Sequence, residues 1–115
     1  MKMKAGVLTT CGAPRPFAKS KPIHVVEVDL DPPHADEVMV KMTASGLCHS
    51  DYHLVTGDIP VPLPYVGGHE GAGVVVEVGP GVTDVAVGDS VVLSFLPACG
   101  KCSPCSRGMT NLCDL

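Results

Sequence analysis

The run Val74-Val75-Val76-Glu77-Val78-Gly79-Pro80-Gly81 gives the clearest indication of secondary structure in this chain of 115 residues. Its valines are β-branched and favour an extended backbone, and the Gly-Pro-Gly sequence that follows is typical of a turn. Similar short segments bounded by glycine or proline lie on both sides of it. The sequence therefore predicts further strands at 4–9, 24–30, 37–44 and 90–95.

Two of these segments alternate apolar and polar residues, which is typical of a strand with one buried face. We expect the apolar residues of both segments to point inward. They are Val26, Val28 and Leu30 in the first segment and Val38, Val40, Met42 and Ala44 in the second.

Composition agrees with a mainly β fold. The 13 glycines and 11 prolines make up about one residue in five, which excludes a helical bundle and favours short strands with many turns. Residues 47–55 lack both residue types and predict one short helix, and a proline-rich loop follows at 60–64. The length fits a single domain covering residues 1–115.

The charge pattern bears on partners and on location. Eight Lys and Arg residues face 12 Asp and Glu residues, and the net charge of −4 without a basic cluster argues against nucleic acid or an anionic membrane as partner. The apolar run after the N-terminus, Ala5–Leu8, is too short for a secretory signal. We therefore expect a cytoplasmic protein, in which the six cysteines are not paired as disulfides.

Four of the cysteines gather in a lobe at 97–115 that contains few large apolar residues. Their pattern is C-x2-C-x2-C-x7-C, and four thiolates can surround one tetrahedral zinc ion. Such a segment needs a metal to fold, because it cannot bury enough apolar surface. The predicted zinc ligands are Cys99, Cys102, Cys105 and Cys113.

The lobe has two alternatives to zinc. Free thiols or disulfides fit poorly, because neighbouring C-x2-C pairs are awkward disulfides and the compartment is reducing. An iron–sulfur cluster is the stronger rival, but the bacterial ferredoxin run ends in C-x3-C-P, whereas here seven residues separate the last two cysteines and Asp114 follows.

Cys48 and His69 are candidates for a second metal position, since His69 lies among glycines that allow the backbone to approach a site closely. A single Cys and a single His are weak signals alone. The chain contains no H-E-x-x-H, no Gly-x-Gly-x-x-Gly and no P-loop. Cys11 has no histidine nearby and is expected to be a small buried residue.

Taken together, four motifs resemble the zinc-dependent medium-chain alcohol dehydrogenases over nearly the whole chain. Within that family, the amino-acid sequence looks most similar to the class III-like bacterial branch. The resemblance implies the N-terminal GroES-like catalytic domain, a partly open β-barrel with short helices. The motifs are Gly46-Leu47-Cys48-His49-Ser50-Asp51-Tyr52-His53, Gly68-His69-Glu70-Gly71-Ala72-Gly73-Val74-Val75, Gly88-Asp89-Ser90-Val91-Val92 and the four-cysteine lobe.

The resemblance also implies a role for each residue around the second metal. Cys48 and His69 look like two ligands of a catalytic zinc, whose third ligand in the family lies beyond Leu115, and Glu70 is similar to the glutamate that approaches the metal during ligand exchange. Asp51 is similar to the carboxylate that orients the histidine ligand, and Ser50 to the hydroxyl residue that touches the substrate oxygen. His53 is similar to the histidine that passes the proton to solvent, and His49 to the residue that contacts the cofactor pyrophosphate.

The implied activity is oxidation of an alcohol to an aldehyde or ketone by hydride transfer to NAD or NADP, in a protein that resembles homo-oligomeric enzymes. The family binds that cofactor on a Rossmann domain, which these 115 residues do not contain, so we expect the chain alone to be inactive. It is then a fragment or a truncated product. The alternative is a non-catalytic GroES-like zinc module that serves as a structural or interaction domain.

Overall fold

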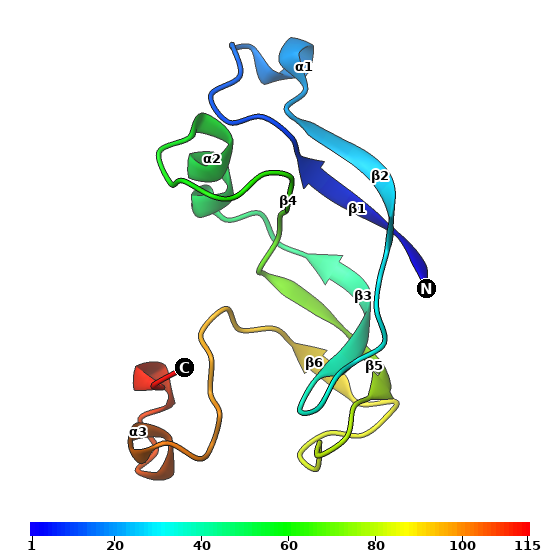
Figure 1. Ribbon diagram of the computed structural model, residues 1–115, viewed down its shortest axis with the longest axis vertical. Coiled ribbons are helices and arrows are strands. Elements are labelled where there is room, and N and C mark those ends of the chain that lie inside the picture. The colour runs from blue at the N-terminus through cyan, green and yellow to red at the C-terminus, as the bar shows by residue number, and fades with distance from the viewer.

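The computed structural model describes residues 1–115 and contains two antiparallel three-stranded sheets (Figure 1). In the first sheet, β1 (Lys2–Leu8) lies between β2 (Ile23–Asp29) and the short β4 (Tyr65–Val66). The β1–β2 register pairs Lys2 with Asp29 and Leu8 with Ile23. This sheet confirms the strands predicted at 4–9 and 24–30, whereas β4 directly follows the loop predicted at 60–64 and was not predicted as a strand.

The second sheet has the order β3-β5-β6. Its central strand, β5 (Gly71–Val78), contains the valine run and pairs on one side with β3 (Val38–Ser45). On its other side lies β6 (Ser90–Val92), which is shorter than the predicted strand at 90–95. The mainly β class is thus confirmed, as two sheets that do not close into a barrel.

Four short helical segments complete the fold. They are α1 (Phe17–Ser20), α2 (His49–Thr56), α3 (Ser103–Ser106) and the 3-10 turn η1 (Thr110–Leu112). Only α2 was predicted, and it begins and ends within two residues of the expected bounds. None of these helices has the length and apolar character needed to span a bilayer.

The inward alternation predicted for 37–44 is wrong. Val38 is 36% exposed and Met42 48% exposed, while Met39, expected to point outward, is half-buried. The reason is that β3 makes extensive contacts only with β5, so no other element packs over its faces. The pairing is also irregular: Val76 of β5 has no partner between Met39 and Val40, and Thr43 of β3 has none between Met42 and Ala44, so only the β3 residues after Thr43 change face.

The alternation predicted for 24–30 is confirmed only as a difference between the faces of β2. Val26 is 41% exposed against 75% for Val25, yet neither residue is buried. The few buried apolar side chains lie elsewhere: Ala5, Val7, Leu8, Val55, Val75 and Cys105.

The cysteine lobe is connected to the second sheet through a segment without regular structure that leaves β6 (Figure 1). Its α3 and η1 lie near the C-terminus, away from the first sheet. One ion pair ties the lobe to the loop between β2 and β3, with Lys101 Nζ 3.6 Å from Asp36 Oδ2. The lobe is therefore supported mainly by its own contacts.

Candidate metal centres

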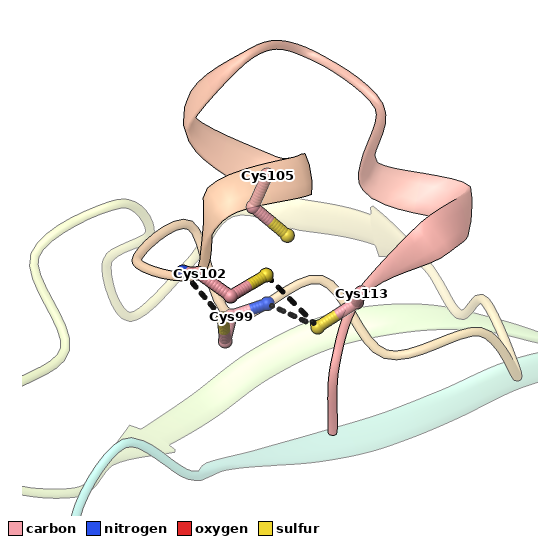
Figure 2. Close-up of side chains that lie close together, drawn as sticks. All are labelled: Cys99, Cys102, Cys105 and Cys113. Atoms are coloured by element: carbon pink, nitrogen blue, oxygen red, sulfur yellow. Dashed lines mark hydrogen bonds between the residues drawn. The ribbon is translucent and has the colours of Figure 1, made fainter.

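The four cysteines of the lobe come together around one point. Figure 2 shows their side chains facing a common space, with Cys102 and Cys105 from the beginning of α3 and Cys113 from the segment after η1. All four sulfur atoms lie within 4.8 Å of one another. The structure thus brings together the complete set predicted from the C-x2-C-x2-C-x7-C spacing.

The sulfur distances fit a tetrahedral metal rather than a disulfide. Cys102 Sγ lies 4.0 Å from Cys113 Sγ, and all six cysteines of the chain are unpaired. A disulfide requires about 2.05 Å between the sulfurs. Four thiolates about 2.3 Å from zinc stand about 3.8 Å apart, which matches the observed separation.

Backbone N–H groups in the lobe stabilise a negatively charged thiolate. The backbone N–H groups of Lys101 and Cys102 donate to Cys99 Sγ over 3.4 and 3.3 Å, and they lower the pKa of Cys99 to about 6. For Cys105, the Gly100 backbone N–H lowers the pKa, but burial and the other three cysteines outweigh it and raise the pKa to about 12. A cation between the four sulfur atoms would favour the deprotonated form of Cys105.

A second group of metal-binding side chains lies between the beginning of α2 and the loop before β5. The ligand atoms of Cys48, His69 and Glu70 lie within 4.8 Å of one another. Cys48 is the residue that precedes α2, and the other two directly precede β5. The helix and the central strand therefore bring together residues more than twenty positions apart in sequence.

The two ring nitrogens of His69 face different side chains, those of Asp51 and Ser50. Its Nδ1 lies 3.4 Å from Asp51 Oδ1, within ion-pair range although without hydrogen-bond alignment, and its Nε2 lies 3.3 Å from Ser50 Oγ. Asp51 Oδ1 is buried and makes no hydrogen bond, which leaves it available to an N–H at Nδ1. That arrangement would free Nε2 for a metal, as in carboxylate–histidine–zinc groups.

The protonation of Cys48 and His69 is linked. Hydrogen bonds from the Ser50 side chain and backbone, and then from His69, lower the pKa of Cys48. The same contact with Cys48 raises the pKa of His69 against the effect of burial. A thiolate and an imidazole are a donor set suited to zinc, and Glu70 supplies a carboxylate beside them.

Gly46 makes room for Glu70. A Cβ at position 46 would lie 2.3 Å from Glu70 Oε2 and 3.1 Å from Glu70 Cβ, and the Gly46 N–H donates to the Glu70 carbonyl over 2.7 Å. A larger residue would push the carboxylate away from Cys48. The end of β3 thus helps to position this group.

The remaining predicted site residues lie along α2. His53 is 4.8 Å from His49 between ring centroids, and its Nδ1 lies 3.0 Å from Asp58 Oδ2. His49 is exposed, and Ser50 faces His69. Cys11, expected to be buried, is only half-buried and belongs to neither group of metal-binding side chains.

Two further residues beside the site were not predicted as site residues. Phe95 packs its ring edge-on against His69 at 5.8 Å and is 72% exposed, because the chain leaves β6 before reaching it. Asp58 follows Gly57, whose φ of 86° turns the chain back toward α2. Gly57-Asp58 is a recognisable turn signal, whereas nothing in the sequence marks Phe95.

Comparison with known proteins identifies the family. Residues 34–115 match the alcohol dehydrogenase GroES-like domain. The chain is 59% identical over 97 residues to alcohol dehydrogenase B of Mycobacterium tuberculosis, covering 84% of this chain and 26% of that protein. It is 52% identical over 115 residues to the NDMA-dependent alcohol dehydrogenase of Amycolatopsis methanolica, covering all of this chain and 29% of that protein.

Solved structures agree. An alcohol dehydrogenase zinc-binding domain protein from Burkholderia ambifaria superposes with a TM-score of 0.84 at 41% identity, over 99% of this chain and 28% of that one. The cobalt- and zinc-bound thermostable alcohol dehydrogenase from Pyrobaculum aerophilum gives 0.81 at 34% identity, over 100% of this chain and 33% of that one.

The chain belongs to the zinc-type medium-chain alcohol dehydrogenase family and forms its GroES-like domain. It spans roughly a quarter to a third of the length of the relatives that it matches.

Proposed function

We propose that this chain is the catalytic-domain part of a zinc-dependent, NAD(P)-linked alcohol dehydrogenase that oxidises an alcohol to an aldehyde or ketone. The observation that carries the proposal is the convergence of Cys48, His69 and Ser50. A thiol, an imidazole nitrogen and a hydroxyl meet within hydrogen-bonding range, with Ser50 Oγ 3.3 Å from His69 Nε2. A purely structural domain has no need of this set.

The two groups of metal-binding residues would hold two zinc ions with different roles. Cys48 and His69 would hold zinc, with Glu70 beside them for ligand exchange, and Cys99, Cys102, Cys105 and Cys113 would hold a second, structural zinc ion. When bound, zinc supplies Lewis acidity that lowers the pKa of an alcohol hydroxyl, and the nicotinamide accepts the hydride. Asp51 keeps the His69 ring in place.

Proton removal would begin at Ser50. Its Oγ accepts the hydroxyl proton of the alcohol and passes its own proton onward, and His53 takes it up at a ring nitrogen and releases it to solvent. The alcohol thus loses one proton through these side chains and one hydride to the cofactor. His49, exposed at the beginning of α2, would contact the cofactor pyrophosphate.

The chain lacks a Gly-x-Gly-x-x-Gly sequence, so we infer that the nicotinamide cofactor binds mainly to a separate Rossmann domain and that residues 1–115 alone are inactive. Six unpaired cysteines agree with a cytoplasmic protein. We further infer a small alcohol or aldehyde as substrate, a homo-oligomeric enzyme, a class III-like bacterial branch and no nucleic-acid or membrane partner.

Steady-state kinetics with primary and secondary alcohols and with NAD or NADP test this proposal in the full-length protein that carries the chain. Ser50→Ala is expected to lower kcat by about 100-fold or more, since it interrupts proton removal. Ser45→Ala is the matched control, because the Ser45 hydroxyl contacts only the neighbouring Gly46 carbonyl. A wild-type protein that binds zinc but turns over no alcohol with either cofactor would instead support a structural module.

A further inference from the structure

A small hydrogen-bonded network closes the C-terminal end of α2. Asp58 Oδ2 lies 3.0 Å from His53 Nδ1 and accepts a hydrogen bond from Thr56 Oγ1 over 2.6 Å. The turn at Gly57, whose N–H donates to the His53 carbonyl over 3.1 Å, folds the chain back so that Asp58 reaches the helix. The contact is thus built by the end of the helix.

The chemistry of this contact determines where the His53 proton lies. The hydrogen bond from Thr56, and then that from His53, lowers the pKa of Asp58, so the carboxylate is ionised near neutral pH. An ionised carboxylate only accepts hydrogen bonds. His53 Nδ1 must therefore be the donor, and in the neutral ring the free lone pair is on Nε2.

We propose that Asp58 is a positioning residue for His53: it fixes the Nδ1–H tautomer and the ring orientation, so that Nε2 is the atom that receives the proton. The inference rests on the proposed function, in which His53 passes the proton to solvent. It assigns to Asp58 a role that the motif around Cys48 does not include.

The other groups around His53 do not replace Asp58. The His49 ring packs edge-on at 4.8 Å and the Tyr52 ring at 6.2 Å. The Arg15 guanidinium lies 5.4 Å from the Tyr52 ring centroid and donates to Tyr52 Oη, and its charge favours the ionised form of Asp58. Among these groups, Asp58 is the only carboxylate, so its removal leaves Nδ1 without a charged acceptor.

Nuclear magnetic resonance of the full-length protein with 15N-labelled histidine tests the tautomer directly. The His53 signal is assigned by its loss in His53→Gln. We expect neutral His53 to carry its proton on Nδ1 in the wild type, and Asp58→Ala to give a mixture of tautomers. Asp84→Asn is the matched control, because Asp84 also accepts from a neighbouring threonine, at 3.4 Å, but contacts no histidine.

Kinetics test the consequence for proton transfer. Asp58→Ala is expected to lower kcat by about 10- to 100-fold with little change in KM, as for other residues that orient an imidazole. Thr56→Val, which removes only the second hydrogen bond to Asp58, should have a smaller effect in the same direction. If Asp58→Ala does not fold by circular dichroism, Asp58→Leu, which has a similar volume and no acceptor, takes its place in both measurements.

Three results would overturn the inference: a wild-type Nε2–H tautomer, a tautomer unchanged by the Asp58 variants, or a changed tautomer with unchanged kcat. A wild-type protein without dehydrogenase activity would contradict the proposed function instead, and with it the role in proton transfer. The tautomer measurement would still decide whether Asp58 orients His53.

Discussion

Asp51 Oδ1 lies 3.4 Å from His69 Nδ1, and the second oxygen of the same carboxylate accepts the backbone N–H of Cys48 over 3.1 Å. One side chain therefore contacts both of the residues that we propose as ligands of the catalytic zinc. The Asp51 side chain is only 13% exposed, so little water competes for these contacts. This relationship explains why an acidic residue stands in the first turn of α2.

Asp51→Asn should weaken zinc binding at Cys48 and His69. The amide keeps the shape of the side chain but loses the charge that favours an N–H at His69 Nδ1, and such changes reduce metal affinity by about 10- to 100-fold. Competition with a zinc-binding dye in the full-length protein measures the effect. Asp31→Asn, at an exposed loop position, serves as control. Equal affinities of the two variants would contradict this role of Asp51.

Removal of zinc should unfold the cysteine lobe while the sheets persist. The lobe has one buried side chain, Cys105, and one ion pair to the rest of the chain, so the metal contributes most of its stability. After chelation we expect trypsin to cleave first at Lys101 and Arg107, with Lys41 in β3 protected. Mass spectrometry of the fragments identifies the sites. Equal cleavage rates with and without zinc would show that the lobe folds without metal.

Gly79→Ala should destabilise the fold. A Cβ at this position would lie 1.8 Å from the His34 carbonyl oxygen, which is backbone and cannot move independently. We expect a loss of about 1–3 kcal/mol or more in the free energy of unfolding, measured by urea denaturation. Gly67→Ala is the control, since a Cβ there meets no atom within 4 Å. The prediction fails if both variants unfold at the same urea concentration.

The network at Asp58 should also make stability depend on pH. The folded protein lowers the pKa of Asp58 below its ordinary value of 3.8, mainly through Thr56 and His53. The stabilisation is then complete above that value and is lost as pH falls through the lowered pKa. The difference in unfolding free energy between the wild type and Asp58→Asn should therefore shrink toward acid pH. A difference that stays constant from neutral to acid pH would contradict the assignment.

Several strands and the cysteine cluster could be predicted from short-range patterns, whereas the group around Cys48 and His69 could not. The valine run, Gly79-Pro80-Gly81 and the cysteine spacing each act over a few residues, and the structure contains the strand, the turn and the cluster that they predict. The proximity of Cys48 to His69 could not be derived in this way, because it depends on how α2 and β5 pack. The sequence alone made Cys48 and His69 only weak candidates for a metal position, and their assignment to one zinc ion came from the resemblance to a known family.

The wrong predictions concern residues whose environment depends on how distant segments pack together and not on the local sequence pattern. The alternation of Val38 and Met42 predicts one buried face, but β3 makes extensive contacts only with β5, so these side chains stay exposed. Tyr65–Val66 lies in a proline-rich stretch and becomes a strand because β1 offers it an edge. Phe95 was assigned to a strand that ends at Val92, which leaves its ring free to contact His69.

We propose that Cys48 and His69 bind one zinc ion and that the four later cysteines bind another. Metal analysis of the full-length protein, repeated on Cys48→Ser and Cys105→Ser, is the decisive test. We expect zinc at both positions, loss of one zinc ion in each variant, and thiolate-to-cobalt absorption bands after exchange. Iron with acid-labile sulfide in the lobe, or a cobalt-exchanged sample without those bands, would contradict it.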